Sequence, residues 1–267
     1  MSATALSRPV VEPAAHLRLE NLTIAYDKPK GAGKLIAVSE ANLEIPRGTF
    51  VTIVGPSGCG KSSLLLSIAG LVKPASGVVK VDGKPVTGPG RDRAVVFQDF
   101  ALMPWRTVID NVRFGLELQR QRTLSADDIT ARARRFVELV GLKGFEHYHP
   151  HQLSGGMRQR VGIARALAVD PDILLLDEPF GSLDAQTRDE MGSELIAIWE
   201  QNRKTALFVT HSIDEAIFLA DRIVVMDANP GRITEIVSVD LPRPRTVETM
   251  DSKEFIEYRR HIRESLK

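Results

Sequence analysis

The sequence is poor in cysteine, in net charge and in long hydrophobic runs. Cys59 is the only cysteine among the 267 residues, so no internal disulfide can form, which fits a reducing compartment. The 35 Lys and Arg residues are balanced by 34 Asp and Glu residues. This balance argues against general nucleic-acid binding, which typically requires a strongly basic domain or face. We therefore expect no nucleic acid among the partners.

The apolar stretches are short. The longest, such as residues 64–72 and 173–176, fall well below the ~20 residues that a helix needs to span a bilayer. Residues 1–15 contain small residues and prolines but no apolar core like that of a secretory signal, and we expect a flexible tail there. Any association with a membrane is therefore expected to be peripheral.

Four apolar runs organise the middle of the chain, at residues 50–54, 94–97, 172–176 and 206–209. They predict buried strands of a parallel sheet within a large α/β domain. Each run is followed at once by polar residues, and ligands of open α/β sheets bind at the carboxyl ends of the strands. The sequence thus predicts one site where the four segments meet.

The flanking segments have different patterns. Residues 17–26 alternate between apolar and polar with a change of phase at Asn21, and Asp82-Gly83 is typical of a tight hairpin, so we expect an antiparallel β layer. Residues 99–152 have apolar positions at helical spacing and predict a helical insert. Within it, Ser125 and Asp128 match a helix start, for a helix continuing to Val140.

Residues 55–62, GPSGCGKS, fit the pattern G-x-x-x-x-G-K-[ST] between a predicted strand and a predicted helix. In this pattern the backbone N–H groups cradle the phosphates of a nucleotide, Lys61 reaches the β and γ phosphates, and Ser62 ligates Mg²⁺. A chance match is the alternative, and the strand-to-helix context argues against it.

Residues 172–179, DILLLDEP, end an apolar run with two carboxylates. Asp177 is predicted to hold Mg²⁺, directly or through water, and Glu178 to activate the attacking water as a general base. The alternative is an acidic pair that simply ends a strand in solvent. The neighbouring phosphate loop favours the functional interpretation.

Residues 153–160, LSGGMRQR, place two glycines where a helix should begin, and bare N–H groups at a helix start attract anions. Together with the phosphate loop and the acidic strand end, this stretch makes the sequence resemble the ATP-binding cassette (ABC) ATPases of membrane transporters. The resemblance covers about residues 17–240. It implies an α/β fold with a P-loop NTPase core, a mainly parallel sheet, an antiparallel β layer and a helical insert.

The resemblance also implies a division of the chain. A flexible tail would occupy residues 1–15. An ABC ATPase domain would occupy residues 16–240, with its helical insert at about 99–165. A linker and a C-terminal helix would follow at residues 241–267.

In this family two cassettes sandwich two ATP molecules, so the resemblance implies a homodimer in which each signature stretch contacts the partner's ATP. Gln98 resembles the glutamine that contacts Mg²⁺ and the lytic water. His211 resembles the switch histidine of the γ-phosphate, and a strand-end histidine satisfied by backbone is the alternative. Asp184 resembles the loop that crosses the dimer interface. Tyr26 matches the aromatic that stacks on adenine, and an ordinary strand tyrosine is the alternative.

The residues expected to act in catalysis are Glu178, His211, Lys61 and Gln98, and those expected at Mg²⁺ are Ser62, Gln98 and Asp177. The residues expected to contact ATP are Tyr26, Gly55, Pro56, Ser57, Gly58, Cys59, Gly60, Lys61, Ser62 and Ser63, and in trans Ser154, Gly155, Gly156 and Asp184.

Residues 101–112 and 228–233 resemble the bacterial importer cassettes for nitrate, aliphatic sulfonates and taurine. The resemblance implies a peripheral ATPase at the cytoplasmic face of the inner membrane. Its partners would be integral membrane permease subunits and, indirectly, a periplasmic solute-binding protein. Met103 and Trp105 would contact the permease, or instead pack within the insert. The alternatives are a soluble ABC-type ATPase not coupled to transport and a cassette that binds nucleotide only as a regulator.

Overall fold

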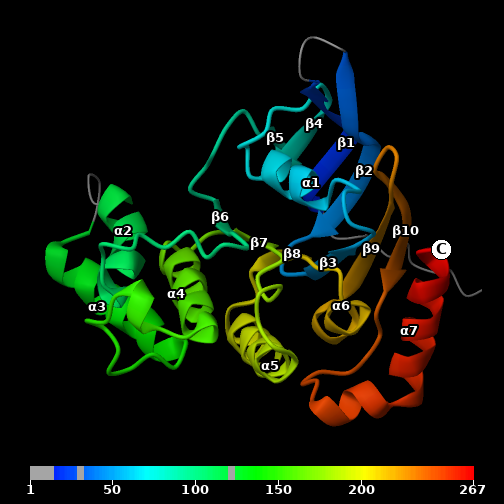
Figure 1. Ribbon diagram of the computed structural model, residues 1–267. Helices are drawn as coiled ribbons and strands as arrows, with labels where there is room; N and C mark the ends of the chain where they lie inside the picture. Colours follow the sequence, from blue (N-terminus) through cyan, green and yellow to red (C-terminus); the bar gives the residue numbers. More distant parts are fainter. Residues whose placement is uncertain (1–14, 29–32, 120–123) are drawn as a thin grey trace, which may run out of the picture.

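A computed structural model describes residues 15–28, 33–119 and 124–267, and it arranges them around two β-sheets (Figure 1). The larger sheet has six strands, in the order β10-β9-β3-β8-β7-β6. Its members are β10 (Arg232–Ser238), β9 (Arg222–Asp227), β3 (Phe50–Val54), β8 (Thr205–Val209), β7 (Ile173–Asp177) and β6 (Arg93–Val96). All neighbours pair in parallel except β9 and β10. The predicted parallel core is confirmed, with strand ends displaced by one residue at most.

The second sheet is antiparallel, as predicted, in the order β2-β1-β4-β5. Its strands are β2 (Lys34–Pro46), β1 (Ala15–Asp27), β4 (Ser76–Val81) and β5 (Lys84–Pro85). The expected change of phase in β1 is a register irregularity between Leu19 and Leu22, where Asn21 has φ +47°. The expected hairpin joins β4 to β5, and Asp82 and Gly83 both have positive φ, as a type I′ turn requires.

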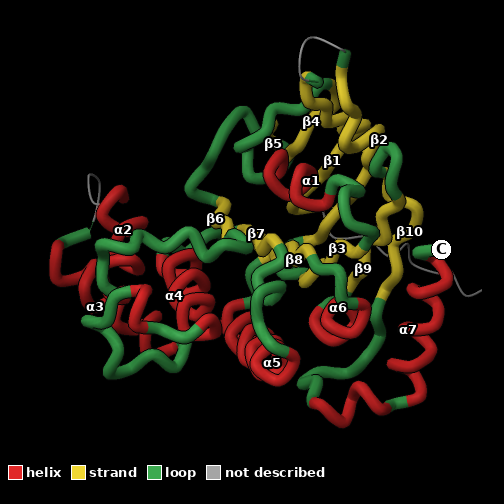
Figure 2. Tube along the Cα trace, viewed as in Figure 1, coloured by secondary structure: helices red, strands yellow, loops and turns green. Residues whose placement is uncertain are grey.

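Period-two alternation in the parallel strands sends side chains to two cores. In β3, Val51 and Ile53 face the antiparallel sheet and helix α1 (Lys61–Ile68), whereas Phe50 and Val54 face the helices on the other side. Those helices include α5 (Ala185–Asn202) and α6 (Ile213–Leu219). Both faces of the sheet are therefore covered, which is why its strands are apolar throughout (Figure 2).

The region predicted as an insert is helical. Its helices are α2 (Val108–Gln119), α3 (Ala126–Leu139) and α4 (Gly155–Ala168), and a 3-10 turn, η2, covers Pro150–Gln152. The capping box predicted from Ser125 and Asp128 is present, and Val140 ends α3. Figure 1 places α2, α3 and α4 together on one side of the molecule.

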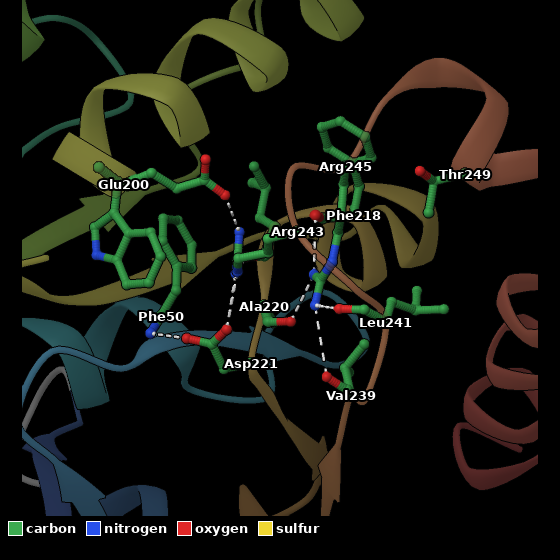
Figure 3. A network of polar contacts seen from close by, with 12 residues as sticks. Phe50, Glu200, Phe218, Ala220, Asp221, Val239, Leu241, Arg243, Arg245 and Thr249 are labelled. Carbon is green, nitrogen blue, oxygen red and sulfur yellow. Dashed lines mark hydrogen bonds and ion pairs between the residues drawn. The ribbon is translucent and has the colours of Figure 1, made fainter.

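The C-terminal segment is bound to the core. A 3-10 turn, η3 (Val247–Asp251), precedes α7 (Lys253–Ser265), which begins at the N-cap Ser252. Residues 241–248 were expected to form a linker, yet Arg245 is only 4% exposed. Its guanidinium donates hydrogen bonds to five carbonyl oxygens, those of Ile217, Phe218, Ala220, Val239 and Leu241. Figure 3 labels the last four of these partners.

A second arginine of this segment reinforces the attachment. Arg243 pairs with Asp221 at 2.9 Å and lies 4.8 Å from the ring centroid of Trp199. Asp221 in turn accepts the N–H of Phe50 at the start of β3 (Figure 3).

Two expectations lie at the edge of what the structure describes. Residues 1–14 of the predicted tail lie outside the described residues, and Ala15 already belongs to β1. Within the described parts of the chain, none of the helices has both the length and the apolar composition needed to cross a membrane.

Candidate functional site

The phosphate loop joins β3 to α1, where the sequence predicted it. Gly60 is the N-cap of α1 and has φ +91°, a left-handed conformation that favours glycine, and a Cβ there would lie 2.6 Å from the Ala37 carbonyl oxygen. Helix α1 starts with no side-chain cap and no acidic residue in its first turn. The N–H groups at its start can therefore serve an anion.

Lys61 supplies the positive charge of this loop. The residue is 5% exposed, and its Nζ donates to the carbonyl oxygens of Gly55 at 2.9 Å and Pro56 at 3.0 Å. Cys59 is fully buried behind the loop, and burial raises the pKa of its thiol. A buried thiol with a raised pKa stays protonated and is a poor nucleophile.

Ser62 and Asp177 meet as the proposed magnesium ligands should. The Ser62 hydroxyl donates to Asp177 Oδ1 at 2.8 Å, across the gap between α1 and the end of β7. Burial, and then the charge of Glu178, raise the pKa of Asp177 above its ordinary value. Burial disfavours the charged form of this carboxyl group, and a bound divalent cation would favour it.

A hydroxyl and a carboxylate are hard oxygen donors of the kind that Mg²⁺ prefers. The described part of the chain holds no cluster of three or more His, Cys, Asp or Glu side chains suited to a metal. Mg²⁺ typically takes one or two protein oxygens and completes its shell with phosphates and water. The residues present therefore fit the ion.

Glu178 is held in an unusual conformation between β7 and β8. Its φ is +43°, rare for a residue other than glycine, and its N–H donates to the Val209 carbonyl oxygen at 3.1 Å. Its Oε2 lies 3.4 Å from Nδ1 of His211. Strained backbone of this kind is frequent at active sites, and here it directs the carboxylate toward the next strand end.

Gln98 reaches the same point from the end of β6. A Cβ added at Gly181 would lie 3.6 Å from Gln98 Nε2 and 3.8 Å from Glu178 Oε2, so both side chains approach one spot. The ends of β6, β7 and β8 thus bring together Gln98, Asp177, Glu178 and His211, as the sequence predicted.

Tyr26 lies beside the phosphate loop. Its hydroxyl donates to Ser63 Oγ at 3.0 Å, and the residue is 39% exposed. An exposed ring next to the start of α1 is where an adenine could stack. The role of Tyr26 stays a prediction.

The signature stretch begins α4 as expected. Ser154 is the N-cap and accepts the N–H of Met157 at 3.2 Å, and Gly155 is the first helical residue. Asp184 caps α5 in the same way, accepting the N–H of Thr187 at 3.0 Å, and this hydrogen bond lowers the pKa of Asp184. A Cβ on Gly156 would lie 3.1 Å from Thr187 Cγ2, so the two helix starts are in contact.

These residues form a second group. Ser154, Gly155, Gly156 and Asp184 surround the starts of α4 and α5, and Figure 1 shows α4 well away from α1. The second group is thus separate from the phosphate loop, and this separation is what the predicted head-to-tail dimer requires.

A polar network next to His211 in the chain was not predicted from the sequence. Thr210 and Glu215 are hydrogen-bonded, and Arg188 lies 3.4 Å from Glu215. The available signal was a carboxylate four positions after His211, directly before the apolar residues 216–219. Because helix starts commonly carry acidic residues, that signal is weak without the tertiary contacts.

Comparison with known proteins gives a consistent result. Residues 38–181 match the family model described as ABC transporter. An uncharacterized ABC transporter ATP-binding protein of Methanocaldococcus jannaschii is 53% identical, over 94% of this chain and 91% of the relative. The nitrate import ATP-binding protein of Synechococcus elongatus is 46% identical, over 83% of this chain and 81% of the relative. A taurine import ATP-binding protein of Yersinia pestis is 50% identical, over 76% and 79%.

Solved structures agree with the sequence relatives. A dimeric bacterial ABC transporter cassette is 34% identical, with a TM-score of 0.75, and covers 85% of this chain and 100% of the cassette. The same cassette in a post-hydrolysis state with ADP and phosphate gives the same values.

Proposed function

Because this chain belongs to the ABC transporter family and is an ATPase, we propose that it energises a bacterial importer of a small anion such as nitrate, taurine or an aliphatic sulfonate. The nitrate and taurine import proteins among its relatives support this choice of solute. The observation that carries the proposal is the meeting of the phosphate loop with Asp177, Glu178 and His211 at one edge of the sheet.

Binding of ATP is the first step. The backbone N–H groups of residues 57–63 and the Lys61 ammonium would hold the phosphates, and the exposed ring of Tyr26 would stack on adenine. Ser62, Asp177 and Gln98 would hold Mg²⁺, which when bound neutralises charge on the β and γ phosphates.

Hydrolysis follows from the geometry of Glu178. Its carboxylate would accept a proton from water while the water oxygen attacks the γ-phosphorus, and the bond to the β,γ-bridging oxygen would break to leave ADP. His211, 3.4 Å from Glu178, would orient that carboxylate and donate to the γ-phosphate. Most of the catalysis would be positioning and electrostatic stabilisation.

The second group of residues would complete the partner's site. Ser154, Gly155 and Gly156 would contact the γ-phosphate held by the other subunit, and Asp184 would cross the interface. ATP binding would close the homodimer, and hydrolysis would reopen it. One chain alone would then be a poor ATPase.

Trp105 supports contact with a permease at the cytoplasmic face of the inner membrane. It is 74% exposed, whereas an indole of the core would be buried. Met103 is partly buried, and its backbone is held by Asn111. Of the two, Trp105 is therefore the better candidate for a permease contact. A periplasmic solute-binding protein would act on the cassette only indirectly, through the permease.

Purification of the tagged chain from gently solubilised native membranes tests the role in transport, with mass spectrometry to identify what accompanies it. A polytopic permease is the expected result. If the chain instead remains in the soluble fraction without a membrane protein, it is an ATPase not coupled to transport.

Uptake of labelled nitrate, taurine and an alkanesulfonate by proteoliposomes then identifies the solute. Trp105→Ser should abolish ATP-driven uptake while the ATPase rate of the purified cassette stays within about twofold. Leu71→Ser, at a residue 50% exposed near the end of α1, is the matched control and should transport normally. Loss of folding in Trp105→Ser would favour packing within the insert.

A further inference from the structure

Glu215 is a largely buried acid outside the predicted site. Its side chain is 13% exposed, and burial raises the pKa of its carboxyl. Its two oxygens have partners from different elements: Oε2 accepts the Thr210 hydroxyl, and Oε1 lies 3.4 Å from Nε of Arg188. A buried carboxylate is tolerated only with such partners, so its position is strongly constrained.

The hydrogen bond from Thr210 to Glu215 restrains the backbone directly before His211. Besides donating to Glu215, the Thr210 hydroxyl accepts the N–H of Ser212 at 3.0 Å, and the backbone N–H of Thr210 donates to Ile53 at 3.1 Å. Hydrogen bonds therefore fix the backbone on both sides of His211. Since the His211 side chain is 54% exposed, this backbone largely determines where its ring points.

Arg188 extends the contact to the loop before α5. Its Nη2 donates to the Leu183 carbonyl oxygen at 3.1 Å, and its backbone N–H donates to the Asp184 carbonyl oxygen at 3.0 Å. One arginine thus contacts both the Leu183–Asp184 loop and Glu215. The described residues connect this loop to His211 through Arg188, Glu215 and Thr210.

We propose that Arg188 and Glu215 are a positioning pair that couples the Leu183–Asp184 loop to His211. The inference rests on the proposed role of His211 at the γ-phosphate and deepens it. When the Leu183–Asp184 loop contacts the partner subunit in the ATP-bound dimer, Arg188 and Glu215 transmit the position of the loop to His211. Each cassette then hydrolyses ATP only when the interface is formed.

The test is steady-state ATP hydrolysis by the full chain with Glu215→Gln, Arg188→Gln and the double variant. Gln at 215 keeps the size and an acceptor for Thr210 but loses the ion pair. We expect kcat to fall about tenfold or more, the KM for ATP to stay within about twofold, and the double variant to lose no more than either single variant. Arg188→Lys should recover part of the rate.

The matched control is Glu194→Gln on α5, the helix that carries Arg188. This substitution breaks the 2.6 Å ion pair with Arg160, which is not part of the contacts around His211. Its kcat should stay within about twofold of the unsubstituted chain. Melting temperatures and binding of a fluorescent ATP analogue are measured for all variants. The inference is overturned if kcat falls no further in Arg188→Gln and Glu215→Gln than in the control, or if the two losses of kcat add in the double variant. It is also overturned if the loss of kcat in each variant is explained by its fall in melting temperature.

The proposed function fails separately. If Glu178→Gln and His211→Ala hydrolyse ATP at the normal rate, the catalytic assignments are wrong, whatever the positioning pair does. If those two variants are inactive while Arg188 and Glu215 variants remain fully active, only the inference about the pair is wrong.

Discussion

The amino ends and the carboxyl ends of the parallel strands, called the amino edge and the carboxyl edge here, both carry polar side chains. These side chains differ in their partners. Beside the amino ends of β3 and β9, Arg245 is 4% exposed and its charge is spread over five carbonyl oxygens. Burial lowers its pKa to about 10, so the guanidinium is still protonated at neutral pH. At the carboxyl edge, Asp177 and Glu178 lie next to each other, and Glu178 has a left-handed backbone.

The difference separates stability from function. At the amino edge both Nη atoms of Arg245 donate to carbonyl oxygens of the chain, and Nε has no hydrogen-bond partner among the described residues. The charge is therefore held mainly by the chain itself, without a ligand. The carboxyl edge has two neighbouring carboxylates and an uncapped helix start, which are groups that a cation and phosphates would balance. Substitutions at the two edges should therefore change different quantities.

The largest effect is expected at the carboxyl edge, for Glu178→Gln. Removal of a general base typically lowers a rate ~10²–10⁴-fold, and Gln keeps the shape of the side chain. ATP binding should persist, so light scattering should detect an ATP-stabilised dimer. Steady-state phosphate release measures the rate. Normal hydrolysis in this variant would mean that another group activates the water.

The next effect is expected at the amino edge, for Arg245→Met. The five carbonyl oxygens would lose their donor, and the free energy of unfolding should fall by about 2–4 kcal/mol in urea titrations. Arg260→Met, at an exposed position of α7, is the control and should change it by no more than about 0.5 kcal/mol. At temperatures where both variants are folded, kcat should match that of the unsubstituted chain. Equal loss of kcat would contradict the separation of the two edges.

A smaller effect of opposite sign is expected for Asp177→Asn. Because the carboxyl pKa is raised in the folded protein, the ionised form destabilises the fold at neutral pH, and this cost disappears as pH falls through the raised value. Without nucleotide, the Asn variant should be more stable at pH 7, by less than about 1 kcal/mol after solvent screening. Urea titrations with and without Mg²⁺ and ATP measure this, and the ligands should reverse the order of stability. A destabilised ligand-free variant would refute the argument.

The carboxyl edge could be predicted from sequence because its signals are local. The glycines and Lys61 of the phosphate loop, and the acidic pair that ends β7, lie within short stretches that follow apolar strands. The same holds for the Asp82-Gly83 hairpin and the Ser125 cap, since each needs only a few neighbouring residues.

The amino edge could not be predicted because its contacts are distant in sequence. Arg245 binds carbonyl groups up to 28 positions away, and residues 241–245, Leu-Pro-Arg-Pro-Arg, have the composition of a linker. The network of Arg188 and Glu215 is hidden for the same reason, because each residue alone is an ordinary charged position of a helix. A buried charge is recognisable only after its partners are known.

The smallest effect is expected where the C-terminal helix meets β10. Glu235 accepts the Ser265 hydroxyl and contacts His261 Nε2, both at 2.7 Å, and these hydrogen bonds lower the pKa of its carboxyl. A carboxyl group whose pKa is lowered in the folded protein stabilises the fold at pH values above its ordinary pKa. This stability is lost as pH falls through the lowered pKa. Glu235→Gln should therefore cost less than about 1 kcal/mol at pH 7, since the contact is partly exposed, and nothing at strongly acidic pH.

Hydrogen exchange of the α7 amides at the two pH values measures this small effect, with Glu264→Gln, exposed on the same helix, as the control. If Glu235→Gln releases α7 at every pH, the helix is held by Glu235 rather than by Phe255 and Ile262, which are fully buried. Burial of two large apolar side chains is worth about 3–6 kcal/mol, so we expect these two residues to hold α7 and the Glu235 hydrogen bonds to add little. The attachment of α7 would then depend on apolar packing, whereas the Arg245 contacts and the carboxyl edge depend on charged groups.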